Sequence, residues 1–307
     1  MLRFAPPRML TAEEACDLPS EDACAAYRAR GWHVTRAILP AALLDAVAAD
    51  VARHARGDVD AALPPIATRM DWTSASRQVI RIHGYLALQL RAVQALVAHP
   101  LIGAIAARLT ATEEVRLFHD RLIIKPGGLP AAATETGWHT DVAYWRTSSS
   151  HRLLTAWIAL DGCPADAGPL AVVEGSQRWA EPCLERRFLT PDIDGEVPAA
   201  MVPPGVTPRI VTLPVERGQI VFHHCGILHR SSPNRGARDR IALAVHLQDR
   251  DNRFVPCLQP NGRQLVHSND LLCRRGPDGR PDFRDPAVFP VLWSAATPSP
   301  PPAPPPR

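Results

Sequence analysis

The second half of the chain is a succession of short β-rich runs, and this pattern constrains the fold more than any other feature. Beyond Glu113, runs of Val, Ile, Leu and aromatic residues alternate with segments of Gly, Pro, Asp and Asn. Several short strands after a helical region predict a β-sandwich or barrel with helices packed on one outer face. The double-stranded β-helix, or jelly roll, is one such solution. The runs cover 115–125, 153–161, 209–215, 219–229 and 240–248.

The preceding region, from about 20 to 110, is helical in pattern. Apolar residues recur at helical spacing through 43–51, and we expect two helices here, broken between 31 and 40. A second apolar stretch, 86–109, contains a proline and predicts two further helices that meet at His99.

Length and composition indicate one globular domain. Of the 307 residues, 46% are hydrophobic and 21% charged, which suits a single core that we place within 1–296, with its β part at about 113–250. Residues 297–307 are proline-dense and predict a disordered polyproline II tail. Two long stretches, 127–137 and 180–208, predict loops at the mouth of a site.

Charge, cysteine content and apolar runs narrow the possible partners. The net charge of +3 is spread along the chain without a basic block, so we expect no nucleic-acid partner. Seven cysteines without a C-x-x-C pair indicate neither a disulfide framework nor a zinc ribbon. No signal-like stretch and no run of about 18 apolar residues stands out, which predicts a soluble cytoplasmic protein without a membrane partner.

One histidine is followed two positions later by a carboxylate. Among the twelve histidines only His139 has this arrangement, with Asp141. Alternate residues of a strand point to one face, so this imidazole and carboxylate can approach one metal ion. A second histidine would complete a two-histidine, one-carboxylate set, which leaves three positions open on iron(II).

Four histidines are candidates for the third ligand, and we choose His229. It ends a β-rich run before a turn-rich segment, and Arg240 opens the next run, so we expect a hairpin to bring the two together. His223 and His224 are more typical of strand residues packed on opposite faces. The fourth candidate, His246, lies further along the chain.

Arg240 predicts a site for 2-oxoglutarate. The keto-acid end of this co-substrate chelates iron, while its 5-carboxylate requires a permanently charged, fork-shaped donor. Ser231 can add a hydroxyl donor beside it. Ala242 and Ala244 share the strand face of Arg240 and leave room for a ligand. His246 on that face is expected either to contact substrate or to be a hydrogen-bonded core histidine.

The combined register of these motifs resembles the phytanoyl-CoA dioxygenase family. Lys125 lies 14 residues before His139, Trp157 lies 18 residues after it, and Arg240 lies 11 residues after His229. The likeness covers about 115–248, and the motifs that carry it are KPG at 125–127, GWHTD at 137–141, AW at 156–157, GPL at 168–170, EGS at 174–176, GQIVF at 218–222, HRSSPN at 229–234 and RIAL at 240–243.

The resemblance implies a jelly roll with iron at one mouth, and Fe(II), 2-oxoglutarate and O₂ as cofactor and co-substrates. Two positions depart from the family pattern: Gln177 stands where histidine is common, and Thr140 where glutamine is frequent. The implied iron ligands are His139, Asp141 and His229, and the implied 2-oxoglutarate residues are Arg240, Ser231, Trp157 and Lys125.

The family's chemistry is oxidative, coupling decarboxylation of 2-oxoglutarate to hydroxylation and, by extension, to desaturation, ring formation or epimerisation. We expect a small-molecule substrate, a secondary-metabolite intermediate, with an acyl-CoA or carrier-bound acyl group as the alternative. Asp141 argues against halogenation, because related halogenases have Ala or Gly there. Substrate contacts are expected from Arg121, Tyr144, Trp145 and His246, although such aromatic residues are also typical of core packing.

Two other classes stay open at this point. A non-catalytic jelly roll that binds a metal or small molecule would not need a 2-oxoglutarate anchor, so Arg240 and Ser231 count against it. A cupin-like zinc hydrolase would need a general base, and the sequence offers no additional Glu or His placed for that role.

Overall fold

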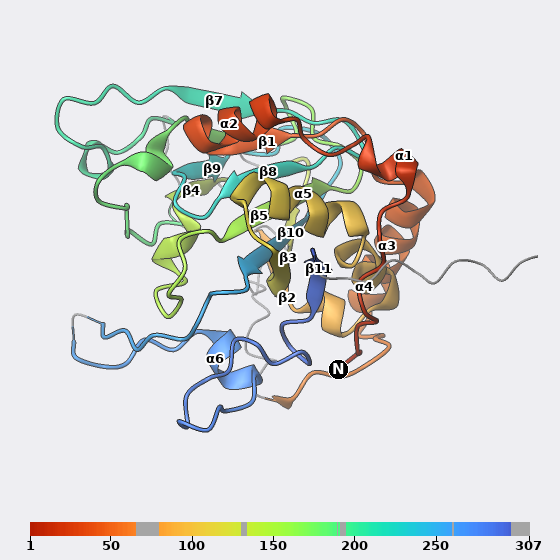
Figure 1. Ribbon diagram of the computed structural model, residues 1–307. Helices are drawn as coiled ribbons and strands as arrows, with labels where there is room; N and C mark the ends of the chain where they lie inside the picture. Colours follow the sequence, from red (N-terminus) through yellow and green to blue (C-terminus); the bar gives the residue numbers. More distant parts are fainter. Residues whose placement is uncertain (66–79, 130–133, 189, 191–194, 260, 296–307) are drawn as a thin grey trace, which may run out of the picture.

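Two antiparallel sheets face each other, and helices cover the outer face of the larger one (Figure 1). The computed structural model describes residues 1–65, 80–129, 134–188, 190, 195–259 and 261–295. Within these residues the larger sheet runs in the order β1 (Trp32–Val34), β8 (Val221–His224), β5 (Leu154–Ala159), β10 (Arg240–Asp249), β3 (Glu114–Lys125) and β11 (Val291–Ser294), with β2 (Arg81–Gly84) also paired to β3. The smaller sheet runs β4 (Thr136–His139), β9 (His229–Ser231), β6 (Leu170–Val173) and β7 (Ile210–Leu213).

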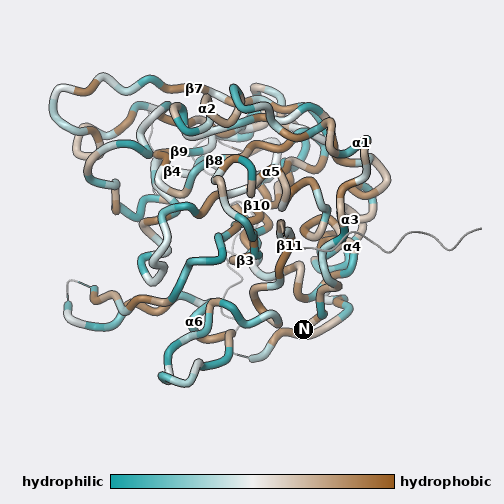
Figure 2. The backbone as a smooth tube through the Cα atoms, in the orientation of Figure 1, coloured by the Kyte–Doolittle hydropathy of each residue, from teal (hydrophilic) through white to brown (hydrophobic). Residues whose placement is uncertain are grey.

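Alternation along the central strand β10 divides the interior into two layers. Leu243 and Val245 belong to the apolar core beneath the helices, whereas Ala242 and Ala244 pack toward the smaller sheet with Leu170. Hydrophobic segments accordingly gather where helices and strands meet (Figure 2). The small residues on the inner face leave space between the sheets, and the predicted jelly-roll fold is confirmed.

The helical region begins and ends where local sequence dictates. The Ser20 hydroxyl accepts the Ala23 N–H at 3.2 Å and caps α2 (Glu21–Arg30). Gly31 ends this helix at φ +85°, a left-handed conformation that strongly favours glycine. The other helices are α1 (Ala12–Ala15), α3 (Ala41–His54), α4 (Arg91–Val97), α5 (Pro100–Thr110) and α6 (Ser268–Leu272), with short 3₁₀ turns η2 (Leu86–Leu88), η4 (Asp141–Ala143), η5 (Ser176–Arg178) and η6 (Ala199–Met201).

The stretch Arg91–Thr110 is the one part of the described chain with the length and hydropathy of a membrane-spanning helix. In the fold it is two helices, α4 and α5, and 67% of the stretch is buried. Its division at His99, with Pro100 opening α5, is as predicted. Both are core helices: α5 packs against β3 and β11, and α4 packs against α3 and η2.

The structure departs from the sequence-based expectation in its strand boundaries. Strands β1, β2 and β11 lie outside the expected β region of 113–250, β6 was not among the expected β-rich runs, and the strand expected at His139 is β4, which ends at that residue. These strands are three or four residues long, too short for a periodic signal. The tail at 297–307 and parts of both expected loops lie outside the described residues.

The run 219–229 is two strands rather than one. It forms β8 in the larger sheet and β9 in the smaller, separated by a turn at 225–228. The expected hairpin between His229 and Arg240 is therefore wrong, because β9 pairs with β4 and β6 whereas β10 pairs with β3 and β5. The turn-rich segment between them crosses from one sheet to the other.

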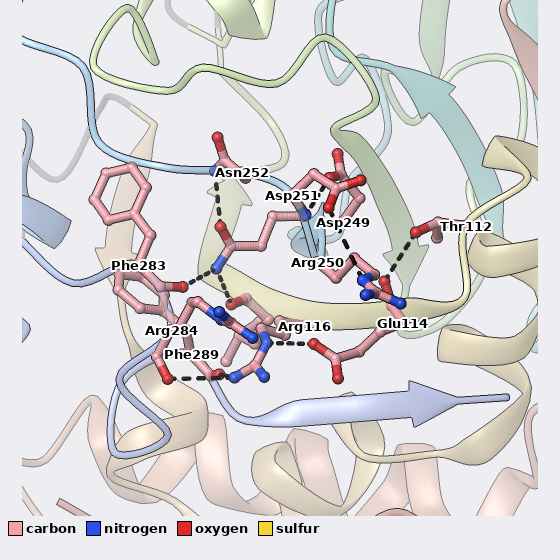
Figure 3. A network of polar contacts seen from close by, with 12 residues as sticks. Thr112, Glu114, Arg116, Asp249, Arg250, Asp251, Asn252, Phe283, Arg284 and Phe289 are labelled. Carbon is pink, nitrogen blue, oxygen red and sulfur yellow. Dashed lines mark hydrogen bonds and ion pairs between the residues drawn. The ribbon is translucent and has the colours of Figure 1, made fainter. Parts of the chain in front are cut away.

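A polar network joins the C-terminal segment to the centre of the larger sheet (Figure 3). The Arg116 guanidinium donates to the Glu114 carboxylate at 2.7 Å and to the carbonyls of Arg284 and Phe289. Gln248 Nε2 donates to the Leu117 and Phe283 carbonyls at 3.3 and 3.1 Å. These bonds satisfy buried groups of β3 and β10 and hold 283–289 against the sheet.

Candidate active site

A cavity of about 410 Å³ lies between the inner faces of the two sheets. Three predicted ligands line it: His139 at the end of β4, Asp141 at the start of η4, and His229 at the start of β9. One ligand atom from each lies within 4.8 Å of the others, and all three side chains are buried. No other group of this kind occurs in the described part of the chain.

The strand register brings the two histidines together. His139 and His229 are partners across the β4–β9 ladder, with ring centroids 4.2 Å apart. His139 Nδ1 lies 2.8 Å from the Gly137 carbonyl, and His229 Nδ1 lies 3.0 Å from the Ile227 carbonyl. A carbonyl only accepts, so each Nδ1 carries the proton and each Nε2 lone pair is available to a metal.

Asp141 is positioned by residues from the larger sheet. The Thr155 hydroxyl donates to Asp141 Oδ2 at 2.7 Å, and His223 Nε2 lies 3.2 Å from the same oxygen. The other carboxylate oxygen, Oδ1, faces the two histidines and lies 3.8 Å from His229 Nε2. Burial alone raises the pKa of Asp141, but the His223 hydrogen bond and the neighbouring histidines hold that pKa well below its usual value.

His139 and Asp141 do not lie on one strand, contrary to the prediction from their spacing. His139 ends its strand, and Asp141 is the first residue of a 3₁₀ turn, so the two do not occupy alternate positions of one strand. The turn nevertheless delivers the carboxylate to the same side. Two imidazoles and a monodentate carboxylate form a donor set suited to iron(II) with open positions.

Arg240 lies in the same cavity. It is 4% exposed, and among the described residues nothing bonds to its Nε or Nη1. The guanidinium lies 5.3 Å from the centre of the Trp157 ring. Burial lowers the pKa of Arg240 to about 10, so it stays charged at neutral pH. An unpaired buried guanidinium beside a metal-binding set fits a ligand that carries a carboxylate.

The other residues assigned to 2-oxoglutarate differ in position. Ser231 and Trp157 line the cavity, and the hydroxyl groups of Ser231 and Thr136 form a hydrogen bond of 2.8 Å. Lys125 does not line it: its ammonium group donates to the Ser231 and Ser232 carbonyls at 2.9 and 2.6 Å. This geometry makes Lys125 a support for β9 beneath the site, and direct contact with 2-oxoglutarate stays a prediction.

All four residues expected to contact substrate line the cavity, namely Arg121, Tyr144, Trp145 and His246. His246 Nδ1 lies 2.8 Å from the Thr155 hydroxyl, which already donates to Asp141, so this nitrogen is the donor. Burial lowers the pKa of His246 to about 3. His246 is therefore a neutral member of the network behind the carboxylate as well as part of the wall.

Sequence reasoning missed several residues of this site. His223 was considered as a ligand or as a packed strand residue, and Thr155 was not singled out, yet both hold Asp141. His119 and Phe188 also line the cavity. Thr155 lies two residues before Trp157 on a β-rich run, so strand alternation could have indicated that it faces the same side. The positions of His119, His223 and Phe188 depend on strand register and on the course of the loop, which the sequence does not show. His224, by contrast, lies outside the cavity, and burial lowers its pKa to about 4.

A jelly roll that carries two histidines, one carboxylate and a buried arginine between its sheets defines the class of non-haem iron, 2-oxoglutarate-dependent oxygenases. The comparison with family models agrees: the model described as phytanoyl-CoA dioxygenase (PhyH) matches residues 27–242. The chain belongs to the phytanoyl-CoA dioxygenase family.

Curated relatives match a shorter part of the chain. The phytanoyl-CoA dioxygenase domain-containing protein 1 homolog of Caenorhabditis elegans is 23% identical over 145 residues, which are 46% of this chain and 49% of the relative. The corresponding protein of Bos taurus is 30% identical over 125 residues, 39% of this chain and 41% of the relative. The chain spans about half the length of the curated relatives it matches, or less.

Solved structures share the fold over most of the chain. The non-haem alpha-ketoglutarate-dependent carbocyclase SnoK from nogalamycin biosynthesis has a TM-score of 0.66 at 21% identity, covering 89% of this chain and 96% of its own. EctD from S. alaskensis with 2-oxoglutarate and 5-hydroxyectoine has a TM-score of 0.60 at 21% identity, covering 90% and 94%.

Proposed function

We propose that the protein is an Fe(II)- and 2-oxoglutarate-dependent dioxygenase that oxidises a small molecule. The observation that carries this proposal is the presence, in one cavity, of a buried His-Asp-His set and the Arg240 guanidinium, whose Nε and Nη1 have no partner among the described residues. Without an anionic ligand, that buried charge would be a large unfavourable term, so its position is best explained by a bound carboxylate.

Each residue has a distinct role in this proposal. His139 and His229 offer Nε2 to the iron and Asp141 offers Oδ1, while Thr155 and His223 fix the carboxylate through Oδ2. Bound iron and 2-oxoglutarate would together activate O₂, the oxidant: one oxygen atom would enter succinate as the keto acid loses CO₂, and the other would oxidise the substrate. The protein supplies orientation, charge balance and shielding.

Shielding is provided by the segment around Phe188. Its ring lies 4.9 Å from that of His139, edge to face, and its carbonyl accepts the Gly137 N–H at 3.1 Å. Its own N–H donates to the Tyr144 hydroxyl at 3.1 Å. An apolar ring fixed over a metal ligand keeps bulk water from the open positions.

The finer assignments are proposals too. We infer a secondary-metabolite intermediate as substrate, supported by the fold shared with enzymes of nogalamycin biosynthesis, and a cavity of about 410 Å³ suits a free small molecule better than a whole acyl-CoA. An acyl group on a carrier is the alternative. We also propose one domain over 1–296, supported by the pairing of β11 with β3, and a cytoplasmic location.

The test is turnover of 2-oxoglutarate. Wild-type protein with Fe(II), ascorbate and air should release succinate from 2-oxoglutarate, slowly without substrate. Asp141→Ala and Arg240→Met should abolish this release, whereas Arg28→Met, a change at an exposed arginine of α2, should not. Succinate release that survives Asp141→Ala would reject the proposal.

A further inference from the structure

Arg121 carries a second positive charge in the cavity, on the side distant from Arg240, and the cofactor site does not account for it. Arg121 projects from β3 into the cavity, where its register neighbours are Gly84 on β2 and Ala244 on β10. These small neighbours leave the long side chain unobstructed. Among the described residues no carboxylate or carbonyl bonds to its guanidinium, although the group is partly buried.

Arg186 adds a third arginine from the loop above. Its guanidinium lies 4.7 Å from the centre of the Tyr144 ring, and Tyr144 is in turn bonded to the Phe188 backbone. The loop is therefore held at the cavity, with Arg186 lining it despite being exposed. No acidic partner pairs with Arg186 within the described chain.

The two arginines act on the same neighbours. Burial, together with the positive charges of Arg121 and Arg186, lowers the pKa of His267 to about 3. Burial raises the pKa of Tyr144, and both arginines offset part of that rise. This end of the cavity is thus an electropositive region with two cationic sources.

His119 supplies an unused hydrogen-bonding group at the same place. It precedes Arg121 by two residues on the same strand face, lines the cavity and is 1% exposed. Neither of its ring nitrogens has a partner in the described residues. Burial holds the pKa of His119 well below its usual value, so it is neutral, with one donor and one acceptor for a ligand.

The charges of the proposed cofactor site balance without Arg121 and Arg186. Fe(II), Asp141, Arg240 and the dianion of 2-oxoglutarate sum to zero, which leaves Arg121 and Arg186 uncompensated. Asp141 is the sole carboxylate among the described lining residues. Arg240 and Arg121 lie four residues apart in the β10 register, which is about 13 Å along a strand. One 2-oxoglutarate cannot neutralise both ends.

We propose that the substrate carries an acidic oxygen group, a carboxylate or a phosphate, which binds between Arg121 and Arg186 with His119 as an additional hydrogen-bonding partner. The inference rests on the proposed function, because it takes the triad and Arg240 as the cofactor site. It narrows the substrate to a small acid whose oxidised carbon lies between its anionic group and the metal. A bidentate arginine contact would select such an acid over its neutral analogues.

Binding of matched probes tests this inference without turnover. Protein loaded with Zn(II) and 2-oxoglutarate is titrated by calorimetry with 3-phenylpropionate, 3-phenylpropanamide and 2-phenylethyl phosphate. We expect one of the two anions to bind at least about tenfold more tightly than the amide, the better anion distinguishing carboxylate from phosphate recognition. Arg121→Met and Arg186→Met should each remove that preference, and Arg28→Met should retain it.

Three results would overturn the inference: no preference for either anion over the amide, a preference that persists in both arginine variants, or a loss of 2-oxoglutarate affinity in Arg121→Met. The proposed function is tested separately, by measuring the binding of 2-oxoglutarate to the protein loaded with Fe(II). Anion preference without 2-oxoglutarate binding would reject the proposed oxygenase function and support the anion site. Binding of 2-oxoglutarate without anion preference would support the oxygenase function and reject the anion site.

Discussion

His139 and His229 face each other across the β4–β9 ladder, and each hydrogen-bonds through Nδ1 to the carbonyl two residues before it. The same local geometry is thus used twice, on two paired strands, to present two Nε2 atoms to one point. Because the backbone carbonyls fix both tautomers, both rings already have the orientation that the proposed metal site requires.

Asp141→Ala should remove iron binding and turnover together. The carboxylate is the one negative charge among the proposed ligands, and the variant leaves two neutral imidazoles that hold Fe(II) weakly. Iron content after anaerobic loading and desalting checks this directly. Full occupancy with full turnover in Asp141→Ala would refute the proposed ligand set.

Thr155→Val should weaken the metal site without unfolding the protein. The change is nearly isosteric but removes the 2.7 Å hydrogen bond that orients Asp141, and loss of such supporting bonds costs about 10–100-fold in metal affinity. Competition with a chelator measures the change. Thr212→Val on the exposed face of β7 is the matched control, and equal affinities for the two variants would contradict the positioning role.

Arg240→Met should stabilise the protein without ligands and abolish its stabilisation by 2-oxoglutarate. Arg240 is a buried charge, and within the described part of the chain nothing bonds to its Nε or Nη1, so an apolar replacement removes the unfavourable free energy of burying that charge. Wild type should gain melting temperature when 2-oxoglutarate and Zn(II) are added, and the variant should gain it from Zn(II) alone. A 2-oxoglutarate-dependent gain in the variant would contradict the anchor.

His267 should contribute to loss of stability in acid. Burial lowers its pKa to about 3, below the value of about 6.5 in an unfolded chain, so unfolding takes up a proton between these values. Its contribution is complete above pH 6.5 and is lost as the pH falls toward 3, at up to about 1.4 kcal/mol per pH unit.

The test for His267 is urea unfolding of His267→Asn at pH 7 and pH 5. Asparagine retains an acceptor for the Asn269 N–H that His267 caps, but it cannot take up the proton. The variant should therefore lose less stability on acidification than wild type. His151→Asn, at an exposed position, should follow wild type. Identical slopes for all three proteins would show that His267 is not the titrating group.

Sequence patterns predicted the long strands and the proposed ligands because both have local signals. The runs 115–125 and 240–248 correspond to β3 and β10, which are 12 and 10 residues long and rich in Val, Ile and Leu, so their signal is easily recognised. His139, Asp141 and Arg240 were singled out by residue type and spacing. The helix pair divided at His99 followed from its proline.

The remaining features depend on contacts between distant segments. The run 219–229 looks continuous in sequence, and only the turn at 225–228 and the pairing of β9 with β4 assign its two halves to different sheets. His119 and Thr155 acquire their positions from the register that aligns β3, β10 and β5. No single-sequence signal encodes that alignment.

The central claim is that one cavity holds iron through the His-Asp-His set and 2-oxoglutarate through Arg240. Its most direct test is the visible spectrum of anaerobic protein with Fe(II) and 2-oxoglutarate, because a metal-to-ligand charge-transfer band requires the keto acid to chelate the iron. We predict a band in wild type and in Arg28→Met that is absent in His229→Ala and strongly weakened in Arg240→Met. Iron bound without any band in wild type would contradict the account.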